Sequence, residues 1–313
     1  MSGTSPSLRP EPLSRGLASG DPEDLAELFA GAWDAMIDLA GRIYPDQPSR
    51  LDGWTVRDVL IHLGSWEEHR IFARLLDDAR HGRVHELDDA DARNDLVVAA
   101  HHDASAEEIL AALADARDRG LDFLCSPEAH TLGREWTETA LGQLPVAGVL
   151  AASTFELAVH ALDIAEPEQI PVALLDAGVA ALVDLVGALA ARRGLRTMVA
   201  VVTPSGSWGT STEPNSWMTV PLAPVQAREL RWPAVEGCAQ DILDAAAGRQ
   251  LAAQLLLTRR FRLHDLPALL RLTPALEEVT GLPGGPALRA AARTLGQTAQ
   301  LIGRLGNAVR NRF

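Results

Sequence analysis

Apolar residues recur every three or four positions in the N-terminal half of the chain, which is the spacing of one face of a helix. The first such segment runs from about residue 22 to 44. Asp21, Pro22 and Glu23 mark its start, because an Asp side chain caps free backbone N–H groups and proline suits the first turn. The expected buried face comprises Leu25, Leu28, Phe29, Ala32, Trp33, Met36 and Leu39.

The same spacing predicts three more helices in this half, from Thr55 to about Arg80, from Ser105 to about Leu124 and from Leu144 to Ala165. The polar stretch 81–103 holds clustered Asp, Arg and His, and we expect it to be irregular with a helical part. Helices with long connections between them predict a four-helix bundle over residues 21–166. Residues 1–20 are rich in Ser, Pro and Gly, so we expect a disordered leader and no signal peptide.

Beyond Pro167 and Pro171, helices alternate with short β-rich segments. Helices are expected at 172–192, 238–247 and 266–272, strands at 197–202 and 217–220, a turn region between these strands, and an extended piece at 229–233. The alternation predicts a smaller α/β domain at residues 167–285, which makes the fold class of the chain α+β. Residues 286–313 are basic and amphipathic, and we expect a C-terminal helix there that docks on its own domain.

The charge of the chain divides at the same place. Residues 1–166 hold 13 Arg against 31 acidic residues, a net charge of −18, whereas residues 167–313 hold 15 Arg against 11 acidic residues, a net charge of +4. The split supports two domains, and a chain with a net charge of −14 is poorly suited to bind nucleic acid. All 28 basic residues are Arg, which excludes Schiff-base catalysis by lysine and a P-loop lysine.

Hydrophobic residues make up 47% of the chain, as in soluble globular proteins. We find no convincing membrane span in the sequence and therefore expect a cytoplasmic protein, either monomer or homodimer. Cys125 and Cys238 fit no metal-binding or disulfide pattern, and we expect both to be small buried residues.

The most informative polar residues lie in the apolar helix expected at 144–165. Glu156 and His160 are four residues apart and therefore share one face of that helix. Among apolar neighbours, both cost free energy unless a partner satisfies them. His62 in the second predicted helix is a third candidate, and two ligands one turn apart plus one from a facing helix can hold a metal in a bundle. The spacing also fits an ordinary ion pair on a solvated face, and both interpretations stay open.

Three separated motifs occur in a familiar order: Gly53-Trp-Thr-Val-Arg-Asp-Val-Leu-Ile-His62, Leu141-Gly-Gln-Leu-Pro145 and Phe155-Glu-Leu-Ala-Val-His-Ala-Leu-Asp163. With these motifs the chain resembles the mycothiol-dependent maleylpyruvate isomerase family over about residues 20–166. The resemblance implies a DinB-like bundle in which His62, Glu156 and His160 bind a divalent metal, usually zinc, and leave one position open. The second half is similar in pattern to the sterol-carrier-like domain of many members.

The resemblance also implies a chemistry, in which a zinc-bound thiolate, formed from mycothiol, attacks a small electrophile. The product is either an isomer or an S-conjugate. An Arg of the C-terminal domain is expected to bind substrate carboxylates, and the candidates are Arg228, Arg231, Arg259 and Arg260.

Two further residues near the motifs have alternative interpretations. Asp163 matches the His-x-x-Asp pattern of the family and could accept the free N–H of His160, although a surface Asp at a helix end would look the same. Trp66 lies one turn after His62 and could form a wall of the site, or belong to the core.

Three functions therefore remain open from the sequence. The first is a metal- and thiol-dependent transferase or isomerase. The second is a DinB-like metalloenzyme of specialised metabolism that uses no thiol. The third is a metal- or lipid-binding protein without turnover. The partners of the first are a small electrophile and a low-molecular-weight thiol.

Overall fold

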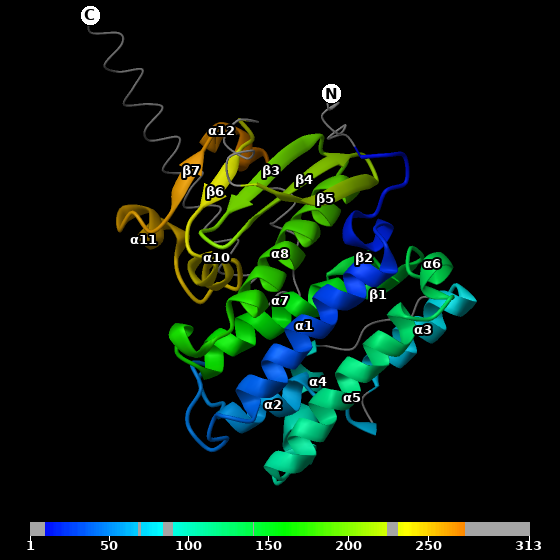
Figure 1. Ribbon diagram of the computed structural model, residues 1–313, viewed down its shortest axis with the longest axis vertical. Helices are drawn as coiled ribbons and strands as arrows, with labels where there is room; N and C mark the ends of the chain where they lie inside the picture. The colour runs from blue at the N-terminus through cyan, green and yellow to red at the C-terminus, as the bar shows by residue number, and fades with distance from the viewer. Residues whose placement is uncertain (1–9, 68–69, 84–89, 140, 224–230, 273–313) are drawn as a thin grey trace, which may run out of the picture.

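The computed structural model describes residues 10–67, 70–83, 90–139, 141–223 and 231–272. Within these residues, a helical N-terminal part is followed by a part in which helices pack against a mixed β-sheet (Figure 1). The α+β fold class predicted from the sequence is therefore confirmed. The expected C-terminal helix at 286–313 lies outside the described residues.

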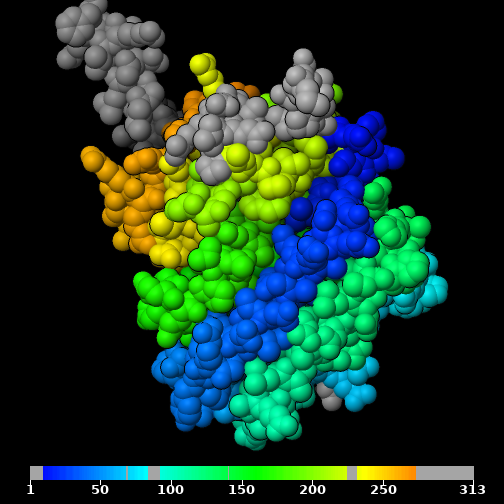
Figure 2. Space-filling view, viewed as in Figure 1, coloured from blue at the N-terminus to red at the C-terminus, as the bar shows by residue number. Residues whose placement is uncertain are grey.

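Four of the N-terminal helices, α1, α2, α5 and α7, pack on one another as a bundle. Figure 2 shows α1 and α5 side by side across one face of the molecule. A hairpin of β1 (Trp136–Thr139) and β2 (Gly142–Pro145) leads directly into α7. The helices of this part are α1 (Pro22–Ala40), α2 (Val56–Leu63), α3 (Ile71–His81), α4 (Ala90–His101), α5 (Ala106–Leu124), α6 (Ala129–Leu132) and α7 (Val146–Ile164).

Three of the four helix starts predicted in the N-terminal half are confirmed in atomic detail, whereas the helix expected from Leu144 begins at Val146. The side chain of Asp21 accepts a hydrogen bond from Glu23 N at 3.0 Å. Thr55 opens α2 and Ser105 opens α5, each with a capping box in which side chain and backbone bond reciprocally. The apolar face of α1 is buried as predicted, except that Leu28 is only partly buried.

The helix predicted from Thr55 to Arg80 is wrong as a single element, because α2 ends at Leu63 and α3 begins at Ile71. At the break, Trp66 Nε1 donates to the carbonyl oxygen of Ile61 at 2.8 Å. Ser65 N donates to the carbonyl oxygen of Ala112 at 2.9 Å. These bonds satisfy backbone groups that a continuing helix would otherwise use, so the chain turns away at this point.

The C-terminal part is built on a five-stranded sheet in the order β5-β4-β3-β6-β7, in which only β3 and β6 are parallel. The long helix α8 packs against β3, β4 and β5, and α10 packs against both α7 and α8. The elements are η3 (Pro167–Gln169), α8 (Val172–Arg192), β3 (Thr197–Val202), β4 (Ser207–Glu213), β5 (Ser216–Leu222), β6 (Ala234–Glu236), α10 (Ala239–Ala246), α11 (Ala252–Leu257), β7 (Arg262–His264), α12 (Leu266–Leu269) and η4 (Leu270–Leu272).

The strand β4 was missed, because Ser207–Glu213 was expected to be a turn region. The strands β1, β2 and β7 were not predicted either. Strand β4 lies between β3 and β5, so its backbone groups are paired on both sides. That pairing stabilises a strand whose Ser and Gly residues carry little β propensity of their own. The extended piece expected at 229–233 lies partly outside the described residues, and β6 begins just after it.

The helices α7 and α8 are each long and apolar enough to cross a membrane by length and composition alone. Their most apolar windows are 83% and 72% buried inside the protein, which identifies both as core helices. A single hydrophobic cluster contains residues of α1, α7, α8 and α10. The core thus continues across residue 167, and the division into two domains there stays a prediction.

The predicted leader is wrong for its last residues, because Gly16–Ser19 form the short helix η1, which packs on α7, α8 and β5. The carboxylate of Asp184 in α8 binds this segment. Its Oδ1 accepts from Leu17 N at 3.0 Å, Trp217 Nε1 at 2.9 Å and Thr219 Oγ1 at 2.7 Å. Cys125 and Cys238 are both exposed, so the expectation that they are buried is also wrong.

Asp184 makes a pH-dependent contribution to stability, because burial raises its pKa to about 6. The native state then binds a proton more tightly than the unfolded chain, so this contribution falls as the pH rises from about 4 to 6, by roughly 3 kcal/mol. Asp184→Asn removes the ionisation and keeps an acceptor oxygen. In urea unfolding, we expect the variant to gain stability relative to the parent between pH 4.5 and 7.5. An equal difference at both pH values would contradict this.

Candidate metal centre

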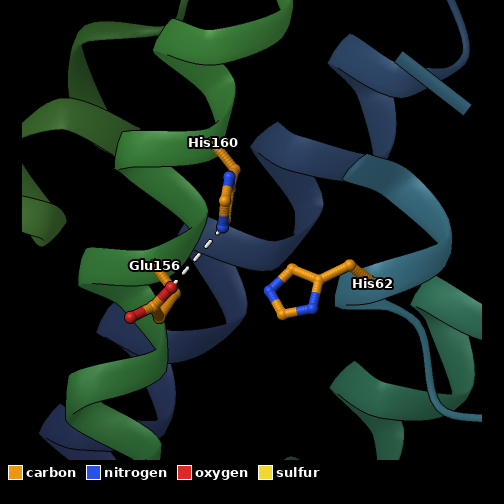
Figure 3. Close-up of side chains that lie close together, drawn as sticks. All are labelled: His62, Glu156 and His160. Carbon is orange, nitrogen blue, oxygen red and sulfur yellow. Dashed lines mark ion pairs between the residues drawn. The ribbon is translucent and has the colours of Figure 1, made fainter. Parts of the chain in front are cut away.

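Three side chains from two helices converge in the N-terminal part. His62 extends from the last turn of α2, and Glu156 and His160 extend from consecutive turns of α7 (Figure 3). One possible ligand atom from each residue lies within 4.8 Å of the others. The rings of His62 and His160 are 5.1 Å apart between centroids and meet edge to face at 77°. The structure therefore brings together all three residues that the sequence selected.

The two histidines have opposite electrostatic surroundings. Burial, together with the nearby His160, lowers the pKa of His62 to about 4. Burial alone would also lower the pKa of His160, but its contacts with Asp163 and Glu156 outweigh burial and raise that pKa to about 9. Burial would raise the pKa of Glu156, yet the neighbouring His160 holds it below its usual value, so this carboxylate is ionised.

The hydrogen bonds of His160 leave one ring nitrogen directed into the cluster. Nδ1 lies 3.0 Å from Asp163 Oδ2, an arrangement in which the ring N–H donates to the carboxylate. Nε2 is buried without a hydrogen-bond partner and lies 3.5 Å from Glu156 Oε2, an ion-pair contact longer than a normal hydrogen bond. A buried polar atom of this kind requires a partner.

This donor set fits a divalent metal. Two imidazole nitrogens and one carboxylate oxygen are ligands that Zn²⁺ accepts, and three protein ligands leave a fourth position for another molecule. The alternative of an ion pair on a solvated face is confirmed in part: Glu156 and His160 form the ion pair, but His160 is only 3% exposed, so the face is not solvated. Glu156 is the partly open member, with its side chain 32% exposed.

The surroundings of His62 come partly from the stretch that the sequence left mainly irregular. Residues 90–101 of that stretch form α4, which packs against α2. The side chain of Asn94 in α4 lies beside His62 and acts to raise the pKa of that imidazole, against the larger effect of burial. The ring of Trp54 lies edge-on to His62, with 5.7 Å between centroids. Trp66 stacks on His101 with 3.9 Å between centroids, and its part in the site stays a prediction.

The arginine that the structure connects to the site was not among the sequence candidates. Arg249, in the turn after α10, forms an ion pair with Asp163 at 2.9 Å. Arg231 and Arg259 are exposed, and Arg260 forms its ion pair with Asp241 of α10. Arg228 lies outside the described residues. No local pattern marks Arg249, because its contact with Asp163 spans 86 residues of sequence.

Comparison with known proteins agrees with the resemblance seen in the sequence. Residues 29–165 match the family model of the mycothiol maleylpyruvate isomerase N-terminal domain. No curated protein matches the chain. Two solved structures are similar, one of the mycothiol-dependent maleylpyruvate isomerase and one of a histidine-to-alanine mutant of that enzyme. Each shares 18% identity over 73% of this chain and 90% of the other, with TM-scores of 0.46 and 0.45.

Proposed function

We propose that this chain, whose residues 29–165 belong to the mycothiol maleylpyruvate isomerase N-terminal domain family, is a metal- and thiol-dependent enzyme acting on a small electrophile. The reaction is an isomerisation like that of maleylpyruvate, or the transfer of the thiol to the substrate. The observation that carries the proposal is the convergence of His62, Glu156 and His160 around the buried Nε2 of His160, which forms no hydrogen bond and lies in an ion-pair contact with Glu156.

The residues of the chain support a divalent cation, of which Zn²⁺ suits the donor set best. His62 and His160 would each bind it through one ring nitrogen, and Glu156 through a carboxylate oxygen. Such a cation would supply Lewis-acid activation, lowering the pKa of a thiol that reaches the open position. One carboxylate and two neutral imidazoles leave about one net positive charge on the complex, which favours an anionic sulfur.

Other residues of the chain prepare the site. Asp163 orients His160 through a hydrogen bond at Nδ1, and Asn94 of α4 lies beside His62. The buried apolar residues Phe155, Leu157 and Val159 fix the helix that carries Glu156 and His160. The partly exposed Glu156 marks the side from which a thiol would approach. The domain family supports mycothiol as this thiol.

The proposal is tested by turnover of the full-length chain, loaded with Zn²⁺, on a panel of electrophiles that includes maleylpyruvate. We expect product only when both metal and mycothiol are present, with glutathione and cysteine as comparison thiols and His62→Ala as the inactive control. Turnover that needs metal but no thiol would show a thiol-independent metalloenzyme. Metal binding without turnover on any electrophile would show a binding protein, and either result would overturn the proposal.

A further inference from the structure

Two arginine–aspartate ion pairs join the bundle to α10 and the turn after it. Arg249 donates through Nε and Nη2 to the two carboxylate oxygens of Asp163, at 3.0 and 2.9 Å. Arg50, in the loop between α1 and α2, donates through Nη1 and Nη2 to the two oxygens of Asp244, both at 3.1 Å. Both carboxylates are buried. Bidentate pairs of this kind fix the orientation of a carboxylate as well as neutralising its charge.

The backbone closes these two pairs into a ring of contacts. Arg249 N and Gln250 N both donate to the carbonyl oxygen of Asp244, at 2.7 and 3.2 Å. On the bundle side, Arg50 N donates to the carbonyl oxygen of Asp163 at 2.8 Å, and Arg50 Nη1 donates to that of Leu162 at 3.0 Å. The last turn of α7 is thus held against the end of α10, and its free carbonyl groups are satisfied.

Asp163 connects this ring of contacts to His160. Its Oδ2 accepts hydrogen bonds from both His160 Nδ1 and Arg249 Nη2, while Oδ1 accepts from Arg249 Nε. The guanidinium therefore fixes the plane of the carboxylate. A carboxylate fixed in this way holds the imidazole in the orientation that directs Nε2 toward Glu156 and His62.

We propose that Arg249 is a positioning residue of the metal centre, which acts through Asp163 on the imidazole of His160. The turn after α10 thereby sets the affinity of the bundle for a divalent cation. This inference rests on the proposed metal centre. It differs from a purely structural role, in which Arg249 would only tie two parts of the chain together.

The chain offers a matched control for this distinction. Arg260 forms an ion pair with Asp241, a buried carboxylate of the same helix, α10. The Arg260 pair is also bidentate, with hydrogen bonds from Nε and Nη2 to the two oxygens of Asp241. Asp241 makes no contact with His160 among the described hydrogen bonds and ion pairs. Arg260→Ala therefore removes a bidentate ion pair of the same type without disturbing the orientation of His160.

The test measures the Zn²⁺ affinity of the full-length chain by competition with a chromophoric chelator. Arg249→Ala is expected to weaken Zn²⁺ binding by about 10- to 100-fold, the usual effect of losing a group that supports a metal ligand. Arg249→Lys should weaken it as well, because lysine keeps the charge but not the bidentate geometry. Arg260→Ala should bind Zn²⁺ as the parent does. With Co²⁺ at saturation, the visible spectrum should change in both Arg249 variants and stay unchanged in Arg260→Ala.

The outcomes separate this inference from the proposed function. Parental Zn²⁺ affinity and Co²⁺ spectrum in folded Arg249→Ala and Arg249→Lys, with binding lost in Glu156→Gln, would overturn the role of Arg249 alone. Parental affinity in Glu156→Gln and His160→Ala would overturn the metal centre itself. If Arg249→Ala does not fold, the Zn²⁺ affinity and the Co²⁺ spectrum of Arg249→Lys and Asp163→Asn are compared with those of the parent instead. Both substitutions keep the approximate shape of the side chains that they replace.

Discussion

Glu156→Gln is expected to abolish high-affinity metal binding and turnover while the protein stays folded. Loss of a supporting group already costs about 10- to 100-fold in affinity, so replacing a ligand carboxylate by a neutral amide should cost more than about 100-fold. The fold should persist, because the side-chain shape is kept and the apolar neighbours on α7 remain buried. Metal content and Zn²⁺ affinity measure the first effect, and the melting temperature of the metal-free chain measures the second.

Leu157→Ala is the control on the same helix, because it should lower stability while the metal ligands are kept. Leu157 is 1% exposed, so truncating it should destabilise the protein by about 2–5 kcal/mol. A site that a metal fills also gains stability from that metal, about 2.7 kcal/mol at a free concentration 100 times the dissociation constant. We expect Leu157→Ala to retain this gain and Glu156→Gln to lose it. Equal loss of melting temperature in both metal-free variants would indicate that Glu156 is structural.

Gly178→Ala is expected to destabilise the protein, although alanine favours helices. Gly178 lies in α8, where an added Cβ would overlap the Cβ of Ala158 in α7. Because both atoms belong to short side chains, the two helix backbones must separate, at a cost of about 1–3 kcal/mol or more. Ala158 lies between Glu156 and His160, so the same displacement should weaken Zn²⁺ binding.

The control for this substitution is Gly31→Ala in α1, where an added Cβ would meet nothing within 4 Å. That change should stabilise the chain by about 0.5–1 kcal/mol, the usual gain from replacing glycine within a helix. Chemical denaturation of both variants gives the comparison directly. If Gly178→Ala were as stable as Gly31→Ala, the close approach of α7 and α8 would not be required for the fold.

The sequence by itself determined where three helices of the bundle begin and which three residues are the candidate ligands. Periodicity and capping residues are local signals, so Asp21, Thr55 and Ser105 located the helix starts correctly. The spacing of Glu156 and His160 placed both on one face of α7, because the period of a helix is fixed by its backbone. Three motifs in order then indicated the family whose N-terminal domain model matches residues 29–165.

Only the tertiary structure decided the features that depend on contacts between distant residues. The break after α2 follows from bonds that Ser65 and Trp66 make, one of them to α5. The strand β4 is stabilised by pairing with both of its neighbours. The N-terminal segment packs because Asp184, in α8, accepts a hydrogen bond from Leu17 N.

Arg249 is the clearest example of a feature that only the tertiary structure decided. The family resemblance implied that an arginine of the second half binds substrate carboxylates, and the candidates for that role did not include Arg249, which pairs with Asp163. The position of Arg249 beside the site depends on the ring of contacts through Asp163, Asp244 and Arg50. This ring joins segments separated by up to 194 residues of sequence. Contacts of that range are formed by the packing of α10 against α7, and no local pattern of residues encodes them.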